Sequence, residues 1–110
     1  MDIQPKTILI YQANNGRKPF DDWYLRLKNP KAKLIIRKRI NQIALGNLGD
    51  CKAVKDDMYE LRINDGPGYR LYFAMEEMAV IVLLLGGDKS TQKEDIQKAE
   101  EYYNDYKSRS

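Results

Sequence analysis

The chain has 110 residues, of which 43% are hydrophobic and 32% charged, which is enough for one compact domain over residues 1–110. It has no histidine and a single cysteine, Cys51, which excludes a Ser-His-Asp triad, a Cys-His pair, an internal disulfide and a histidine-ligated zinc site. The longest apolar run, Met78–Leu85, has eight residues and is too short to cross a membrane. The first residues lack the basic-then-apolar layout of a secretory signal. We therefore expect a cytoplasmic protein without a metal or other cofactor.

Positive charge is concentrated in the first half of the chain. Residues 1–55 carry 12 basic and 4 acidic side chains, whereas residues 56–110 carry 7 basic and 12 acidic ones, and the net charge is +3. The segment Arg26–Arg39 holds seven basic residues and no acidic one. Such a segment either attracts polyanions, largely without regard to their sequence, or is the solvated face of a helix. Charge alone leaves both interpretations open.

The first half predicts one strand followed by two helices. The β-branched, apolar segment Thr7–Tyr11 is typical of a strand. A helix is expected to begin at Pro19, and its apolar face consists of Phe20, Trp23, Tyr24 and Leu27. Asn29 and Pro30 form the cap and first position of a second helix that runs to about Leu45. This helix is expected to bury Ala32, Ile36, Ile40 and Ile43 and to turn Lys33, Arg37 and Lys38 outward.

The second half changes to the period of two that is typical of strands. Met58–Ile63 and Tyr69–Ala74 alternate on either side of the turn-forming segment Asn64–Gly68, which predicts a hairpin. Val80–Leu85 is apolar throughout, as in an inner strand covered on both faces, and Gly86-Gly87 is expected to end it.

A last helix is predicted from Thr91 and Glu94, which have the spacing of a capping box. Its apolar face consists of Ile96, Ala99, Tyr103 and Tyr106. The element order is therefore β-α-α-β-β-β-α, with the strands of the second half largely consecutive. This order predicts an α+β fold: a small, mainly antiparallel sheet with two N-terminal helices packed on it and a C-terminal helix.

The predicted hairpin brings together residues that could do chemistry. Closing it on its five-residue loop sets Arg62 opposite Arg70 and Glu60 opposite Tyr72, all on one face of the sheet. Two opposed arginines repel each other, at a cost of some tenths to about 1 kcal/mol. Either Glu60 balances them on a solvated sheet face, or the two guanidinium groups are placed to hold a phosphate.

Lys89 adds a third cation. It follows the inner strand in Gly87-Asp88-Lys89-Ser90-Thr91, just before a helix N-terminus, where anions are favoured. Asp88 separates it from the glycine, so the spacing is not that of a P-loop. Lys89 is expected at the rim of the sheet near both arginines. Such cations could support RNA cleavage by the 2′-hydroxyl, by stabilising the charge on the phosphate and protonating the leaving oxygen.

Three segments carry a resemblance to a known family: Glu60-Leu61-Arg62, Gly66–Arg70, and Leu85–Gln92 with its Gly-Gly-Asp-Lys-Ser-Thr-Gln motif. Together they resemble the RelE/ParE toxin superfamily, in particular its HigB-like, phage Gp49-related branch, and the order of elements is similar over nearly the whole chain. The resemblance implies a small toxin of a type II toxin–antitoxin pair. RelE-like members of that superfamily cleave mRNA in the ribosomal A site.

The resemblance also implies roles for single residues. Arg70 falls where RelE-type toxins stabilise the transition state with an arginine, and Lys89 falls at the position of the proposed general acid. Arg62 stands in place of the lysine proposed as general base, and Glu60 replaces a neighbouring lysine. Asp95 lies near the position of a catalytic tyrosine. Glu60 is then a candidate base, and Tyr72 a candidate for stacking on or hydrogen bonding to an RNA base.

Further RNA contacts are expected from the placement of basic residues, and partners are implied by the resemblance. The residues expected to contact RNA are Lys33, Arg37, Lys38, Lys52, Lys55 and Gln92. The expected partners are the ribosome, its mRNA and a HigA-like antitoxin with a helix-turn-helix domain, with which the toxin forms an oligomer; no membrane is involved. Two alternatives stay open, a ParE-like inhibitor of DNA gyrase without nuclease activity and an inactive module that binds its antitoxin.

Overall fold

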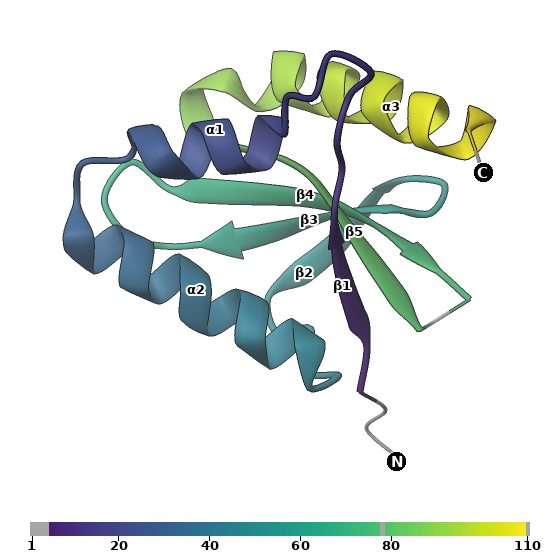
Figure 1. Ribbon diagram of the computed structural model, residues 1–110. Coiled ribbons are helices and arrows are strands. Elements are labelled where there is room, and N and C mark those ends of the chain that lie inside the picture. Colours follow the sequence, from purple (N-terminus) through teal and green to yellow (C-terminus); the bar gives the residue numbers. More distant parts are fainter. Residues whose placement is uncertain (1–4, 78, 110) are drawn as a thin grey trace.

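The computed structural model describes residues 5–77 and 79–109, which form a five-stranded sheet with helices on both of its faces (Figure 1). The elements are β1 (Thr7–Ile10), α1 (Pro19–Arg26), α2 (Pro30–Ala44), β2 (Cys51–Lys55), β3 (Met58–Ile63), β4 (Tyr69–Glu76), β5 (Val80–Asp88), a 3-10 turn η1 (Lys89–Thr91) and α3 (Gln92–Ser108). The strand order is β1-β5-β4-β3-β2, with β1 parallel to β5 and the other neighbours antiparallel. The predicted α+β architecture is confirmed.

The helices begin where the sequence predicts. Pro19 and Pro30 occupy first helical positions, where the missing N–H of proline costs no hydrogen bond. The side chain of Asn29 accepts hydrogen bonds from the backbone N–H of Lys31 (3.0 Å) and of Ala32 (3.3 Å). These bonds satisfy two of the donors that the first turn of α2 leaves free.

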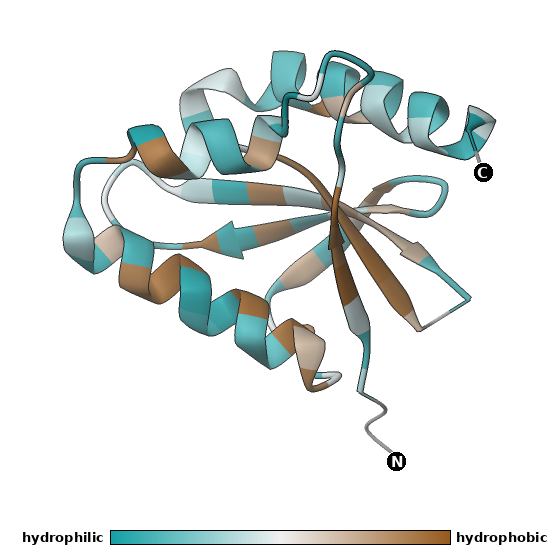
Figure 2. Ribbon diagram, in the orientation of Figure 1, coloured by the Kyte–Doolittle hydropathy of each residue, from teal (hydrophilic) through white to brown (hydrophobic). Residues whose placement is uncertain are grey.

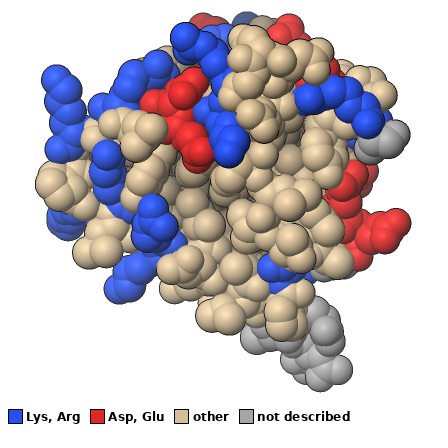
Figure 3. All heavy atoms as spheres, in the orientation of Figure 1, with Lys and Arg blue, Asp and Glu red and all other residues tan. Residues whose placement is uncertain are grey.

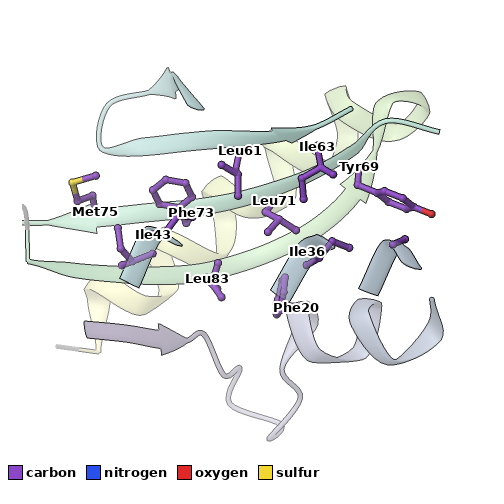
Figure 4. Packing of buried hydrophobic residues seen from close by; sticks show 12 residues of the cluster. Phe20, Ile36, Ile43, Leu61, Ile63, Tyr69, Leu71, Phe73, Met75 and Leu83 are labelled. Atoms are coloured by element: carbon purple, nitrogen blue, oxygen red, sulfur yellow. The ribbon is translucent and has the colours of Figure 1, made fainter. Parts of the chain in front are cut away.

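Two apolar clusters lie on opposite faces of the sheet. Helices α1 and α2 cover the first face, where Phe20 and Ile36 pack against Leu71 and Leu83 (Figure 4). Helix α3 covers the second face. The buried residues there are Tyr11, Met58, Tyr72, Ala74, Val82, Leu84, Leu85, Ala99 and Tyr103. Hydrophobic residues run along β1 and β5, whereas the surface of α3 is mainly hydrophilic (Figure 2). Among the described residues, no helix is both long and apolar enough to cross a membrane.

Strand β2 is absent from the sequence-based prediction. Its residues pair with β3 at the edge of the sheet, and three of the five are exposed. A short edge strand buries little, so its sequence carries no clear alternation of apolar and polar residues. Pairing with β3, not local pattern, holds it in the sheet.

Strand β5 is longer than expected, because Gly86 and Gly87 continue it instead of ending it. A Cβ atom on Gly86 would overlap the indole ring of Trp23 in α1, and one on Gly87 would overlap the carboxylate of Asp95 in α3. The two glycines therefore allow a helix to approach each face of the strand closely.

The predicted capping box of α3 is wrong. Thr91 stands at the N-cap, but its side chain bonds no backbone N–H of the helix, and its hydroxyl donates to Asp95 Oδ2 at 2.5 Å. Asp88 caps the preceding turn η1 instead, since its Oδ1 accepts from the backbone N–H of Ser90 at 2.8 Å. The inserted turn moves the capping function three residues towards the N-terminus.

Candidate functional site

The register of β3 and β4 sets two arginines side by side. Arg62 pairs with Arg70, and Glu60 with Tyr72, as the closure of the hairpin predicts. Cross-strand partners point to the same face of a sheet. These four side chains therefore share the face covered by α3, and the like charges of the arginines lie next to each other.

Glu60 connects the members of this group. Its side chain has no exposed surface, and both carboxylate oxygens accept hydrogen bonds. Oε1 accepts from Arg62 Nε at 3.0 Å and from Arg70 Nη1 at 3.3 Å. Oε2 accepts from Tyr72 Oη at 3.3 Å and from Gln92 Nε2 at 2.6 Å, so that two strands and a helix meet at one carboxylate.

The environment of Glu60 keeps it charged. Burial alone would raise the pKa of its carboxyl, but the hydrogen bonds from Gln92 and Arg62 and the positive charge of Arg70 outweigh burial and hold the pKa below its ordinary value. A general base needs an accessible lone pair and a pKa near the working pH. The buried, fully bonded carboxylate of Glu60 offers neither, which argues against the prediction that it is the base.

Tyr72 is also completely buried. Burial, followed by the negative charge of Glu60, raises the pKa of its phenol, so the hydroxyl stays protonated and donates to Glu60. No surface of the ring is available to RNA. The predicted contact of Tyr72 with an RNA base does not fit this position.

Arg70 has a donor that nothing uses. Its side chain is 11% exposed, and one of its terminal nitrogens bonds to Glu60. Among the side chains of residues 5–77 and 79–109, its Nε is buried without a hydrogen-bond partner. An unpaired buried N–H of a guanidinium costs free energy, so a site that keeps one requires an explanation.

Lys89 lies beside Arg70. Both line a hollow of about 300 Å³ together with residues 64–68, the loop between β3 and β4. Gly68 in this loop has a φ of +77°, and a Cβ there would lie 3.5 Å from Lys89 Cβ. The loop and turn η1 thus bring the exposed amine of Lys89 to the rim of the site that contains Arg70.

The predicted RNA contacts near α3 have different environments. Gln92, the first residue of α3, is part of the group through its bond to Glu60. Lys52 is exposed and stands opposite Glu60 on β2. Lys55 forms an ion pair with Glu100 of α3, so its positive charge is already balanced within the protein.

The basic residues of α2 lie apart from this group. Lys33 Nζ and Arg37 Cζ stand 5.3 and 5.6 Å from the ring centroid of Tyr24, and Arg37 and Lys38 are exposed. Helix α2 packs on the face of the sheet opposite to Glu60, and Figure 3 shows Lys and Arg side chains gathered on the side where α2 lies. The structure brings Arg62, Arg70, Lys89 and Gln92 together but places the α2 residues on another surface.

Residues 30–104 match the family described as phage-derived Gp49-like proteins (DUF891). The chain belongs to the Gp49-like family. This family is part of the RelE/HigB toxin-like group. The matched region includes Glu60, Arg62, Arg70 and Lys89. The Gp49-like chain is also similar to an uncharacterized protein of Haemophilus influenzae (strain ATCC 51907 / DSM 11121 / KW20 / Rd), with 46% identity over 99 residues, 90% of this chain and 91% of that protein.

Two features of the Gp49-like site lie outside the sequence prediction. The bond from Gln92 to Glu60 depends on how α3 docks on the sheet, although Gln92 closes the motif that begins at Leu85. Asp65 lines the hollow and pairs with Lys31 at 3.7 Å. Within the described residues, no three His, Cys, Asp or Glu side chains are grouped so as to hold a metal ion.

Proposed function

We propose that this Gp49-like protein is the toxin of a type II toxin–antitoxin module and that it cleaves mRNA on the ribosome. The observation that carries the proposal is that Arg70, whose buried Nε has no hydrogen-bond partner, lines a hollow open to solvent together with Lys89. A phosphate oxygen is a strong acceptor and matches the planar fork of an arginine. An RNA phosphate in the hollow would accept hydrogen bonds from donors of the Arg70 guanidinium that Glu60 does not use.

These cations contribute to the cleavage step in two ways. The 2′-oxygen forms a bond to the adjacent phosphorus while the bond from phosphorus to the 5′-oxygen breaks, and negative charge grows on the phosphate oxygens. Arg70, with Arg62 next to it, stabilises that charge. Lys89 donates a proton to the leaving 5′-oxygen, and the proton of the 2′-hydroxyl passes to solvent water.

The basic surface of α2 has a separate role in this proposal. Because Lys33, Arg37 and Lys38 lie on the other face of the sheet, they contact a different RNA segment from the one that is cut, namely the backbone of ribosomal RNA. Lys52 is exposed on the same face as Glu60 and extends the path of the mRNA. These contacts are to phosphate, so they weaken as the salt concentration rises. A HigA-like antitoxin would inhibit by covering Arg62, Arg70 and Lys89.

Replacing Arg70 tests the assignment in cells. The variant Arg70→Ala should lose the growth arrest that wild-type protein causes on induction, with a fall in activity of about 100-fold or more, since it removes a charge that stabilises the transition state. The matched control is Arg17→Ala, because Arg17 is an exposed arginine with a 3.7 Å contact to Asp22 and lies outside the hollow. Growth arrest by folded Arg70→Ala at the wild-type level contradicts the site.

A gyrase inhibitor of the ParE type is the second candidate. It is favoured by the absence of an exposed base in the group, because Arg62 replaces the family lysine and Glu60 and Tyr72 are buried. Broken DNA and an SOS response after induction, with intact messages, would establish it in place of the nuclease. If the protein expressed alone causes no growth defect at all, it is an inactive module that binds its antitoxin.

A further inference from the structure

Opposed arginines on neighbouring strands require a counter-charge. Arg62 and Arg70 are direct cross-strand partners, and the second is nearly buried, so their repulsion is weakly screened. Glu60 supplies one negative charge from a fully buried position. A single oxygen, Oε1, contacts both guanidinium groups, and this fixes the position of each relative to the other.

The two arginines use different atoms to reach Glu60. Arg62 donates through Nε, whereas Arg70 donates through Nη1 and keeps its Nε unpaired. The guanidinium fork has five N–H donors, so each arginine retains donors after it has bonded to Glu60. Glu60 therefore orients the pair without using up its capacity to bind an anion.

The second oxygen of Glu60 is held from two sides. Tyr72 of β4 donates to Oε2 from within the sheet, and Gln92 donates from the first position of α3. The bond from Gln92, at 2.6 Å, is the shortest of the four that Glu60 accepts. Four hydrogen bonds from three elements fix the position of the carboxylate. A binding site requires such a rigid support.

We propose that Glu60 is a positioning residue, which holds Arg62 and Arg70 in register for an RNA phosphate, and that Gln92 keeps Glu60 in place from α3. The inference rests on the proposed function for the identity of the anion. Glu60 neutralises part of the charge of the pair, so it lowers the affinity for polyanions in general while it improves the geometry at the scissile phosphate. Affinity and turnover therefore change in opposite directions when its charge is removed.

The variant Glu60→Gln separates these two effects, because it keeps the size of the side chain and removes the charge. Binding to a short single-stranded RNA oligonucleotide at low salt should become about three- to tenfold tighter, since one nearby negative charge is lost. Ribosome-dependent cleavage should become about 10- to 100-fold slower, since misplaced catalytic groups lose rate steeply. A merely structural role would instead weaken both together.

A milder pair of variants keeps the test valid if Glu60→Gln does not fold. Gln92→Ala removes one bond to Glu60 and leaves all charges in place, whereas Gln97→Ala changes an exposed glutamine of the same helix. In this role the amide of Gln92 binds Glu60 and not RNA. Gln92→Ala should therefore slow cleavage about three- to tenfold and leave RNA affinity within about twofold, since no charge changes. Gln97→Ala should match the wild type in both measurements.

The arginine side chains give a readout that does not depend on cleavage. In ¹⁵N NMR spectra, the Nε–H resonance of Arg62 should shift in Glu60→Gln and Gln92→Ala but stay unchanged in Gln97→Ala. Unchanged resonances together with unchanged RNA affinity in Glu60→Gln overturn the positioning role, whether or not the protein is a nuclease. Cleavage of mRNA by Glu60→Gln at the wild-type rate also overturns it, whereas absence of cleavage by the wild type contradicts the proposed function alone.

Discussion

Asp95 is a second buried carboxylate, at the contact between α3 and β5. It is 9% exposed, accepts a hydrogen bond from Thr91 Oγ1 and lies against Gly87. Burial raises the pKa of its carboxyl above the ordinary value, because the bond from Thr91 and the charge of Lys98 compensate only in part. The environment of Asp95 thus favours the protonated form, whereas that of Glu60 favours the charged form.

This difference predicts how stability depends on pH. A raised pKa in the folded state means that the contribution of Asp95 to stability is fully present at low pH and is lost as the pH rises through the folded pKa. Asp95→Asn imitates the protonated form, so it should raise the free energy of unfolding at pH 7.

Urea unfolding at pH 7 and at about pH 3, below the ordinary aspartate pKa, checks this prediction. The gain of Asp95→Asn should disappear at the lower pH. Glu101→Gln, which neutralises an exposed carboxylate of the same helix, serves as control. An equal gain at both pH values would show that the charge of Asp95 is not the cause.

At the residue scale, the local sequence pattern predicts which side chains face each other in the sheet better than it predicts whether they are buried. Strand alternation and loop length were sufficient to place Arg62 opposite Arg70, which the structure confirms. They could not predict that Glu60 and Tyr72 are buried, because burial results from the docking of α3, a contact between segments far apart in the chain. The unpaired Nε of Arg70 is likewise a consequence of three-dimensional packing.

The second half of β5 is the element on which the two layers of helices converge. Trp23 of α1 covers Gly86 on one face, and Asp95 of α3 covers Gly87 on the other. The register also pairs Gly87 with Arg70, so the strand that accommodates both helices is the one beside the site.

Gly86→Ala should force Trp23 away from β5, because its methyl group would overlap the indole ring. We expect the free energy of unfolding to fall by about 1–3 kcal/mol, because this is the usual cost of overpacking a dense interior. Trp23 is the single tryptophan of the chain, so its fluorescence reports the displacement directly. Wild-type stability with unchanged emission would contradict the close approach.

Elements with strong end signals were predictable, and elements that depend on neighbours were not. Asn29 and Pro30 specify the start of α2 by local chemistry, and the structure confirms it. Strand β2 depends on pairing with β3. Helix α3 begins directly after Thr91, as predicted, but the capping side chain is that of Asp88 before η1, not that of Thr91. Gly86 and Gly87 predict the end of β5, but they continue the strand and allow close packing on both of its faces.

At the scale of the whole molecule, the cations that the proposed function uses lie on two separate surfaces. The cations Arg62, Arg70 and Lys89 belong to the side of β3 and β4 next to α3, whereas the basic residues of α2 lie beyond the opposite face of the sheet. Charge counts along the sequence predicted the α2 cluster but not its separation from the arginine pair. One phosphate cannot contact both surfaces, so the proposed function assigns them to different segments of RNA.

The central claim is that Arg70 and Lys89 act on an mRNA phosphate. Its most direct test is to incubate purified protein with ribosomes that are translating a defined message and to map the 5′ ends of the RNA. Wild-type protein and Arg17→Ala should cut within the translated region, whereas folded Arg70→Ala should leave the message intact. Cleavage by Arg70→Ala at the wild-type rate, or no cleavage by the wild type, would contradict the account.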